Sequence, residues 1–447
     1  MPPSKKTPSQ LMDLFLGLAA ELGISSDRDV AALADVGPEA VPNWRSGAVK
    51  EFKAQKFAAA KHNLIALVNA LRAQAGQLDG NAASDLAGIE IEEGSSPSDL
   101  QRQFHDRVSY DYLGHRFLYF DPQGALAWEN LIKAGYEQDC WLAGVAQCAD
   151  GWLDVRKDAS GQAAGPIARA LHLDRRDRPR GLDVISLGAG EGGKELVVLR
   201  RFLAAEATAK QRCRWVTYAP VDVSIPLLLR AVRAARQTFA DAHAGFATRS
   251  VLGFCADFEE SRLGFMKRLR SSFDGESVRL VLILGNVLGN LRDEGVFVRQ
   301  KLWQLARPGD LVWIEVGVRP KDMANDPLFA LTRGKTETAG ETNRRLLIEG
   351  PYRRFAAALG RPMPHLEMRV WLREDDESAR VPGSVNFCHD LVMKDENRVC
   401  TMLYSRRYEM QGLSAWFEGL GFEVMGLAHT HDSQGRDRVG HLLLRRR

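Results

Sequence analysis

The residues best suited to chemistry in this sequence form a glycine-rich turn between an apolar run and a helix-like run. Gly188, Gly190 and Gly192 stand at alternate positions, after the strand-like residues 183–187 and before Lys194. Glycine has no Cβ, so the backbone of such a turn can pass within contact distance of a ligand. The helix that follows offers N–H groups without partners at its start. The turn predicts a nucleotide-type pocket, although tight packing between a strand and a helix also uses glycines.

Two acids follow at the ends of the next strand-like segments. The run 214–221 ends in Asp222, and in a doubly wound sheet an acid there lies beside the first turn and accepts hydrogen bonds from ribose hydroxyls. A third segment ends in Asp257 and Phe258, an acid and an aromatic ring that suit an adenine. Both acids favour the nucleotide-type pocket.

Two further apolar runs complete a predicted sheet. The run 280–284 leads into a turn that contains Asn286 and Asn290, and 311–316 is a fifth strand-like run. Strands that alternate with helix-length segments are typical of parallel α/β sheets, whose ligands bind at the carboxyl ends of the strands. We therefore expect the turn, the acids and the amides to share one edge of the sheet.

The end of the chain predicts how this sheet finishes. A helix-like segment, 410–420, precedes two strand-like runs, 422–430 and 438–445, which a polar turn joins. The arms of a hairpin are antiparallel, so the last strand runs against an otherwise parallel sheet. An NAD-binding sheet is the competing prediction, but its ribose acid usually follows the glycines by about 20 residues. Here Asp222 follows Gly192 by thirty.

This pattern resembles the class I S-adenosylmethionine-dependent methyltransferase fold, and its motifs are similar to those of the histidine Nα-methyltransferase family of ergothioneine biosynthesis. The resemblance covers roughly residues 108–445 and is weakest between 318 and about 390. The motifs that carry it are Lys194 after Gly188 and Gly190; Tyr218, Pro220, Asp222 and Ser224; Asp257 and Phe258; and Gly285, Gly289 and Asn290.

The resemblance implies that S-adenosylmethionine is the cofactor. It implies cofactor contacts for Gly188, Gly190, Gly192, Lys194, Asp222, Asp257, Phe258 and Asn286. On the acceptor side it implies Asn290, which grips the backbone of the amino acid in the family, and Tyr136, for which packing on a core is the alternative. Tyr404 and Ser405 are further candidates for orienting the acceptor.

Two departures from the family limit what the resemblance implies. Ser186 replaces an acid of the first strand, so one cofactor contact is weaker or comes from Glu191 instead. Leu403 replaces the acid that holds the imidazole of histidine in the family. An imidazole N–H buried against leucine loses its partner at a cost of about 1–3 kcal/mol. We therefore expect a small amine or amino-acid-like acceptor other than histidine.

The expected chemistry is N-methyl transfer, which needs few side chains. The sulfonium is already an electrophile, so the protein aligns the acceptor lone pair, excludes water and ensures that the nucleophile is deprotonated. The sequence identifies no general base. It also predicts no metal site, because the histidines at 429 and 431 and the pair 388–389 lack a third spaced ligand. The motifs of DNA-methylating enzymes are absent.

Composition is that of a soluble, cytoplasmic, globular protein. The 447 residues are 45% hydrophobic and 26% charged, with a net charge of +3. Six cysteines without a Cys-x-x-Cys pair indicate reduced, buried thiols. No apolar run reaches the ~18 residues of a membrane span, and the first residues have no signal-peptide core. We expect no membrane partner.

The first 75 residues predict short helices at 11–22, 27–33, 38–45 and 52–71. Residues 29–47 resemble the phage-repressor-like helix-turn-helix family, above all in the run Asn-Trp-Arg-Ser-Gly at 43–47. A basic cluster that can grip DNA phosphates follows, formed by Arg45, Lys50, Lys53, Lys56 and Lys61 with Glu51 as the acid among them. Pro42 inside the reading helix weakens the DNA hypothesis. The alternative is a module for homodimerisation or for docking a partner.

The predicted fold class is α/β with an N-terminal all-α domain. The expected organisation is a helix-turn-helix-like domain (1–75), a linker (76–100), a helical substrate or cap region (101–180), a Rossmann-like methyltransferase core (181–318 and 401–447) and an inserted acceptor or lid segment (319–400). The aromatic run 116–122 is expected in a core. Two alternatives to the enzyme are a DNA-binding regulator whose methyltransferase-like domain senses a metabolite, and an inactive scaffold.

Overall fold

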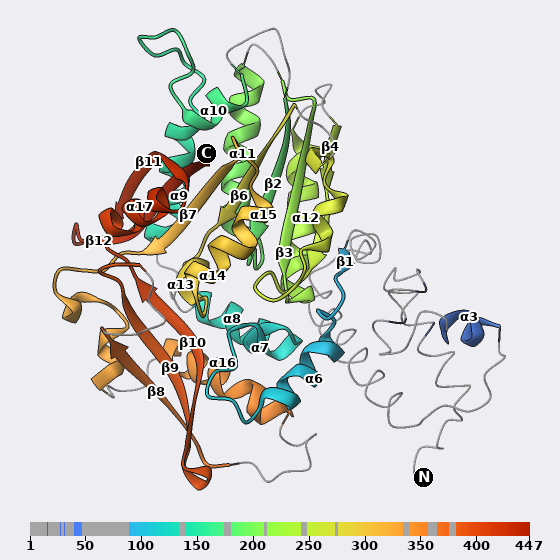
Figure 1. Ribbon diagram of the computed structural model, residues 1–447, viewed down its shortest axis with the longest axis vertical. Helices are drawn as coiled ribbons and strands as arrows, with labels where there is room; N and C mark the ends of the chain where they lie inside the picture. The colour runs from blue at the N-terminus through green and yellow to red at the C-terminus, as the bar shows by residue number, and fades with distance from the viewer. Residues whose placement is uncertain are drawn as a thin grey trace.

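The fold is an α/β arrangement around one large, mostly parallel sheet (Figure 1). The computed structural model describes residues 16, 27, 31, 40–46, 89–133, 139–173, 180–209, 212–242, 248–272, 276–333, 339–355, 364–374 and 381–447. The strand order is β1-β5-β3-β2-β6-β7-β12-β11, with β4 beside β3. The strands are β1 (Ile89–Ile91), β2 (Gly181–Leu187), β3 (Trp215–Asp222), β4 (Thr248–Val251), β5 (Gly253–Cys255), β6 (Ser277–Ile283), β7 (Leu311–Gly317), β11 (Phe422–His431) and β12 (Asp437–Arg446).

The central strands are buried on both faces, as their nearly continuous apolar sequences require. Every residue of β2, β3 and β7 is buried, which is the pattern of parallel strands covered by helices on each side. The register pairs Ile185 with Ala219 of β3 and with Val281 of β6. The carboxyl ends of these strands therefore finish side by side.

Helices cover both faces of the main sheet. Leu182 and Val184 of β2 pack into one core with the helices on their side. Ile185 and Leu187 point the other way into a second core. The first group of helices is α9 (Asp139–Trp152), α10 (Pro166–Ala170), α11 (Gly193–Thr208) and α12 (Ile225–Asp241); the second is α13 (Val287–Asn290), α14 (Glu294–Phe297), α15 (Trp303–Leu305) and α17 (Met410–Gly419).

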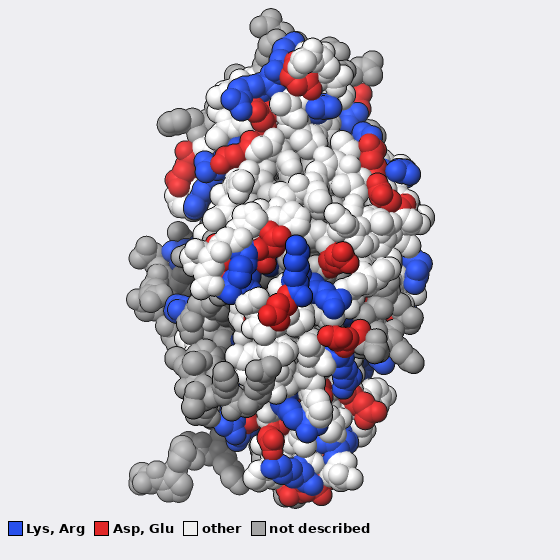
Figure 2. Space-filling view, turned by 90° about the vertical axis from the view of Figure 1, so that its left-hand side faces the viewer, with Lys and Arg blue, Asp and Glu red and all other residues white. Residues whose placement is uncertain are grey.

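The C-terminal hairpin confirms the predicted end of the sheet. The strand β12 lies between β7 and β11 and is antiparallel to both. Because β12 inserts between them, β11 becomes an edge strand. Figure 2 shows the side of the molecule that carries β11, β12 and α9, where Lys and Arg lie next to Asp and Glu and a broad area is uncharged.

A smaller layer lies below the carboxyl ends of the main sheet in Figure 1. It is a three-stranded antiparallel sheet in the order β10-β9-β8, with four helices packed on it in a core of their own. Its elements are α6 (Pro97–Arg107), α7 (Arg116–Tyr119), α8 (Pro122–Lys133), α16 (Ala339–Phe355), β8 (Leu366–Arg373), β9 (Val385–Met393) and β10 (Arg398–Arg407). Segments from before and after the central strands thus form one cap.

Two predicted boundaries need correction. The linker 76–100 includes β1, whose Ile89 pairs with Gly253 of the main sheet, and it includes the start of α6. Ser96 and Asp99 form a reciprocal capping box there, so the chain begins a helix directly after residue 96 and is not a linker at this point. The boundary at 400 falls within β10, because that strand pairs with β9 as far as Arg407.

The N-terminal prediction is largely outside the described residues. One helix, α3 (Ala40–Arg45), agrees with the third predicted helix, and Arg45 Nε lies 2.9 Å from Asp27 Oδ1. The other predicted helices of the helix-turn-helix module fall on residues that the structure does not describe. Across the described ranges, no helix has both the length and the apolar character to cross a bilayer.

Candidate active site

The glycine turn joins β2 to α11 in a left-handed backbone conformation. Gly188, Gly190 and Gly192 have φ values of +65°, +54° and +81°, which L side chains rarely adopt. A Cβ at Gly188 would lie 2.9 Å from Val287, and one at Gly192 would lie 3.0 Å from Ala231. A Cβ at Gly190 would meet nothing within 4 Å. Packing therefore explains two of the glycines, whereas Gly190 faces open space.

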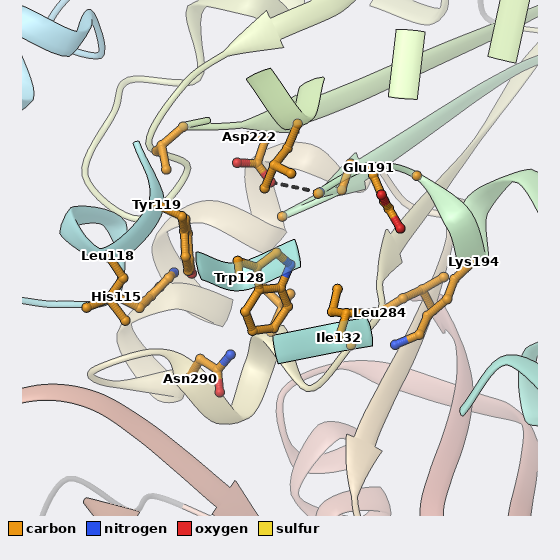
Figure 3. Close-up of a pocket in the computed structure, with 18 of the residues that line it drawn as sticks. His115, Leu118, Tyr119, Trp128, Ile132, Glu191, Lys194, Asp222, Leu284 and Asn290 are labelled. Carbon is orange, nitrogen blue, oxygen red and sulfur yellow. Dashed lines mark hydrogen bonds between the residues drawn. The ribbon is translucent and has the colours of Figure 1, made fainter. Parts of the chain in front are cut away.

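Asp222, at the end of β3, is bonded to this turn. Its Oδ2 accepts a hydrogen bond from the Gly190 N–H at 2.8 Å (Figure 3), and its Oδ1 accepts one from the Ser224 N–H at 2.8 Å. The side chain is 5% exposed, and burial raises its pKa to about 6. The predicted acid thus lies beside the first turn, where a ribose acid belongs.

The turn and Asp222 line a cavity of about 270 Å³ at the carboxyl edge of the sheet. The predicted residues that line it are Gly188, Gly190, Gly192, Lys194, Asp222, Asp257, Phe258 and Asn290. Asn286, Tyr404 and Ser405 are not among its lining residues. Tyr136 lies outside the described residues. One cleft therefore gathers residues from the carboxyl ends of β2, β3, β5 and β6, although the first and last of them, Gly188 and Asn290, are 102 positions apart in the sequence.

Lys194 is held by a buried acid from across the sheet. Its Nζ lies 3.0 Å from Glu315 Oε2 and 4.7 Å from the centre of the Trp141 ring. The same Glu315 oxygen accepts a hydrogen bond from the Gly285 N–H at 2.6 Å. This pair ties the start of α11 to the turn after β6.

The acid nearest Ser186 is Glu195 rather than Glu191. Ser186 Oγ donates a hydrogen bond to Glu195 Oε1 at 2.8 Å, and Glu195 is a buried wall of the cavity. Burial raises the pKa of Glu195 to about 7. Glu191 also lines the cavity but is solvent-exposed and lies 3.5 Å from Arg230. A helix residue therefore supplies a buried carboxyl beside Ser186, the position where the family has an acid in the first strand.

Asp257 carries an ion pair that the sequence analysis missed. Arg116, from α7, binds Asp257 Oδ2 and also lies 2.9 Å from Glu260 Oε2. Oδ1 of Asp257 accepts a hydrogen bond from the Glu259 N–H at 3.1 Å. The adenine-type acid is thus fixed by charge as well as by backbone, and Arg116 itself lines the cavity.

Asn286 positions Asn290 instead of lining the cavity. It adopts a left-handed φ of +60°, and its Oδ1 accepts a hydrogen bond from the Gly317 N–H at 3.0 Å. Its Nδ2 donates to Asn290 Oδ1 at 3.3 Å. A Cβ at Gly289 would lie 2.6 Å from Asn286, so glycine is required for this arrangement. The amide that reaches the cavity is Asn290.

The late motif contributes Leu403, whereas Tyr404, its neighbour in β10, points to the opposite face. Leu403 lines the cavity. Tyr404 stacks on Tyr112 with 5.2 Å between ring centres, and Ser405 Oγ accepts a hydrogen bond from Arg407 Nη1. The prediction that Tyr404 and Ser405 face the acceptor is therefore corrected.

The side of the cavity opposite the glycine turn includes the aromatic run 116–122, which sequence analysis placed in a core. His115, Leu118, Tyr119, Trp128, Leu347 and Leu403 line it, from α7 and its N-cap, α8, α16 and β10. Figure 3 shows Tyr119 and Trp128 between Asp222 on one side and Asn290 on the other. The aromatic run is thus a wall of the site. The sequence feature that could have indicated this role is the position of the aromatic run within residues 101–180, which were predicted to form a substrate or cap region.

Residues 162–316 match a family described as histidine-specific methyltransferase, SAM-dependent. The match extends from before α10 into β7 and covers the glycine turn, Asp222, Asp257 and Asn290. It confirms S-adenosylmethionine as the cofactor expected from the sequence. The N-terminal module lies outside the match.

No protein of curated function matches the chain. Solved structures similar to it include the CcbJ methyltransferase from Streptomyces caelestis, with 14% identity, coverage of 62% of this chain and 92% of that one, and a TM-score of 0.28. The 1,6-didemethyltoxoflavin-N1-methyltransferase from Burkholderia thailandensis has 12% identity, 72% and 87% coverage, and a TM-score of 0.32. A SAM-dependent methyltransferase from Geobacter sulfurreducens has 12% identity, 63% and 89% coverage, and a TM-score of 0.30.

The residues of the cavity fit an adenosyl group with a cationic methionine end. Open space at Gly190 admits a ligand against the backbone, Asp222 provides an acceptor for hydroxyls, and Phe258 provides a buried ring. Glu195 adds a carboxyl within the same wall. Among the described residues, no group of three or more His, Cys, Asp or Glu side chains is arranged to hold a metal ion.

Proposed function

We propose that this protein is an S-adenosylmethionine-dependent N-methyltransferase that acts on a small amine or amino-acid-like acceptor other than histidine. The observation that carries the proposal is the contact between Gly190 and Asp222 at the carboxyl ends of β2 and β3, in a cavity that also reaches Asn290. The position of this contact is the one at which open α/β sheets bind their ligands.

The residues of each cavity wall suggest which part of the reaction they serve. Bound S-adenosylmethionine supplies a methyl group on a sulfonium that is already electrophilic. The glycine turn and Asp222 hold the adenosyl end, and Glu195 faces the positively charged end. Asn290 and the aromatic side chains of α7 and α8 orient the acceptor and exclude water, which is the main contribution a protein makes to such a transfer.

Leu403 is the reason for excluding histidine as the acceptor. It is buried in the cavity wall, and its neighbours there include Leu118 and Leu347. An imidazole N–H against these side chains would be buried without a partner, at a cost of about 1–3 kcal/mol.

Calorimetry with S-adenosylmethionine tests the cofactor half of the proposal. The wild type should bind, whereas Gly190→Val and Asp222→Ala should bind much more weakly. Asp432→Ala, which alters a surface turn held by Arg436 and Arg438, is the control and should bind as the wild type does. No binding by the wild type, or equal binding by all three variants, would refute the proposal.

Incubation with methyl-labelled cofactor and a metabolite extract tests the acceptor half. A labelled small amine supports N-methyl transfer, and a labelled alcohol or acid contradicts it. Cofactor binding without any labelled product would support the inactive scaffold.

The DNA-binding regulator remains a prediction from the sequence. Its basic cluster beyond Arg45 lies outside the described residues, and Arg45 itself is paired with Asp27. Binding of the full chain to duplex DNA, with affinity that falls as salt rises and changes with S-adenosylmethionine, would favour it. If residues 1–75 serve homodimerisation instead, the molecular mass in solution should rise with protein concentration and the chain should not bind DNA.

A further inference from the structure

The acceptor end of the cavity is a chamber with apolar and aromatic walls. We define the acceptor chamber by Leu118, Tyr119, Trp128, Leu347 and Leu403, with His115 and Asn290 as its polar groups. Of these, Leu118, Leu347, Leu403 and His115 are buried. A ligand in the chamber therefore loses its water on all these sides.

Charge within the chamber is already compensated. Among the described lining residues the permanent cations are Arg116 and Lys194, and each is in an ion pair, Arg116 with Asp257 and Lys194 with Glu315. A carboxylate on the acceptor would meet Arg116 only where Asp257 and Glu260 already neutralise its charge. A charged ammonium would be desolvated against leucine, and a cation–π attraction to the Trp128 indole offsets only part of that cost. Burial of an unpaired charge is costly. The chamber thus selects against both.

His115 is placed to exchange a proton with a chamber ligand. It is the N-cap residue of α7, and its ring extends into the cavity toward Tyr119 and Trp128 (Figure 3). Its Nδ1 lies 3.5 Å from Glu259 Oε2. Because Glu259 lies on the Nδ1 side, Nε2 is left for the Asn290 backbone carbonyl or for a ligand that displaces it. Glu259 is itself fixed, since its Oε1 accepts a hydrogen bond from the Arg292 N–H at 3.2 Å.

We propose that the acceptor is an amine that is uncharged at neutral pH, has an apolar body and no carboxylate, and lies in this chamber with its nitrogen near Asn290, where His115 takes up its proton. The inference rests on the proposed function and names its acceptor class. Asn290 Oδ1 accepts from Asn286 with one lone pair, and its second lone pair can accept an N–H of the amine, which leaves the nitrogen lone pair free to attack.

The proton balance assigns His115 its part in the reaction. The acceptor nitrogen forms the new N–C bond with its lone pair while the S–C bond of the cofactor breaks, and that electron pair remains on sulfur. The nitrogen is then positively charged and loses its proton to Nε2 of His115. Burial, aided by Arg116, lowers the pKa of His115 to about 4, so the ring is neutral before transfer.

The charged groups around His115 give the pH dependence its sign. They are Arg116 and Asp257, with Glu259 beside Nδ1 and Glu260 paired to Arg116. The Asn290 backbone carbonyl and the Tyr119 ring are its uncharged neighbours. Burial, aided by Asp257, raises the pKa of Glu259 to about 8. As a carboxylate, Glu259 favours the ring proton on Nδ1, 3.5 Å away, and so leaves Nε2 as a base, whereas a neutral Glu259 gives Nδ1 no such preference. The rate should therefore rise as pH increases through about 8.

Matched acceptors test the class directly on the full chain loaded with S-adenosylhomocysteine. The probes are 4-ethylaniline, its carboxylated counterpart 4-aminophenylacetate, the charged amine phenethylamine, and histidine. Calorimetry should give at least tenfold tighter binding of 4-ethylaniline than of the other three. Absence of 4-ethylaniline binding, or equal or tighter binding of a charged probe, overturns the class. Since cofactor binding is measured separately, this failure is distinct from failure of the proposed function.

Leu403→Lys adds the cation that the chamber lacks. The measured quantity is the ratio of the affinity for 4-aminophenylacetate to the affinity for 4-ethylaniline. Leu403→Lys should raise this binding ratio at least tenfold, and an unchanged affinity for S-adenosylhomocysteine would show that the fold is intact. The control is Leu427→Lys on the exposed edge strand β11, which should leave the ratio unchanged. If Leu403→Lys disturbs cofactor binding, Leu403→Gln should still reduce the difference in affinity between 4-ethylaniline and 4-aminophenylacetate. An unchanged ratio in a folded variant contradicts the charge argument.

His115→Ala and Glu259→Gln test the proton acceptor. General base catalysis contributes typically about 10²–10⁴-fold, and His115→Ala should lower kcat within that range with little change in binding of S-adenosylhomocysteine. In Glu259→Gln an amide N–H faces Nδ1, so the rise near pH 8 should disappear. A wild-type pH profile in either variant, or a loss confined to KM, would show that His115 only packs the chamber wall.

Discussion

Gly190 and Asp222 show how a few atoms define the cofactor side of the cavity. The carboxylate accepts the Gly190 N–H, which fixes the turn, and the absent Cβ of Gly190 leaves space for a ligand. The neighbouring glycines serve packing, because a Cβ there would press on Val287 or Ala231. One turn thus combines a structural requirement with a binding requirement, and each can be measured separately.

Gly190→Ala should greatly weaken the binding of S-adenosylmethionine while it lowers the stability of the fold only modestly. The Cβ meets no protein atom, so the loss of stability comes from the left-handed φ and is about 1–2 kcal/mol. Gly309→Ala is the matched control, because Gly309 also has a positive φ (+89°), open space and no place in the cavity lining. Denaturation should give similar losses for both variants, and calorimetry should show lost S-adenosylmethionine binding in Gly190→Ala alone. Equal affinities would mean that Gly190 does not face the ligand.

The affinity for S-adenosylmethionine should fall as pH falls through about 6. Burial raises the pKa of Asp222 to about 6, and the ionised form is the better acceptor for ribose hydroxyls. Above pH 6 the carboxylate is present and binding is strong; below it, affinity should fall by up to about tenfold per pH unit. Calorimetry between pH 5 and 8 measures this, and Asp222→Asn should bind weakly with the step removed. A step that persists in Asp222→Asn would assign it to another group, such as Glu195.

At the scale of elements, β10 joins the cap to the carboxyl end of the main sheet. Its Arg406 is fully buried, lies 3.3 Å from Glu294 Oε1, and donates to the carbonyls of Leu291 and Arg292. Tyr408 donates to the same glutamate at 3.2 Å. These contacts hold the loop that follows Asn290, so the strand that carries Leu403 also sets the position of the amide.

Arg406→Leu should destabilise the protein strongly. Removal of one partner of a buried ion pair leaves the other charge uncompensated, at a cost of about 3–5 kcal/mol. Arg445→Leu removes an exposed pair with Glu423 and should cost about 0–1 kcal/mol. Chemical denaturation of the two variants measures the difference. Similar stabilities would show that Arg406 and Glu294 do not interact as a buried pair.

On the scale of the whole molecule, the site lies between two layers that the chain builds in separate passes. The helices α7 and α8 come before the first central strand, α16 and β10 come after β7, and together they form one core over the carboxyl ends of the sheet. The acceptor chamber thus depends on the association of both layers. The described cysteines are distributed through these layers, and all six in the sequence are free and buried.

The six thiols should react with a thiol reagent at pH 8 only after the structure opens. Burial raises the pKa of Cys148 and Cys400 to about 12 and that of Cys213 and Cys255 further, and the reactive species is the thiolate. S-adenosylmethionine should slow labelling, because a ligand that binds the folded state stabilises it. Mass spectrometry should find no fast-labelled cysteine in the native protein and six in denaturant. A thiol that labels at the rate of a free cysteine would contradict the packing around it.

Several features were predictable because they depend on local patterns. Continuous apolar runs predicted β2, β3, β6 and β7, and the polar turn near the end predicted the antiparallel hairpin of β11 and β12. The spacing of glycines and acids placed Asp222 beside the turn. Parallel strands end at one edge, so Asp257 and Asn290 were expected in the same cleft, and both line it.

What the tertiary structure alone decided is the set of partners and the direction in which side chains point. Arg116 meets Asp257 across 141 positions of sequence, and Glu195 meets Ser186 where Glu191 was expected. Asn286 turns away from the cavity because its left-handed backbone directs its amide to Gly317 and Asn290. Local sequence determines which segments are strands and helices, since that depends on near neighbours. The wall of a pocket depends on which distant segments pack together, and only the folded chain brings them into contact.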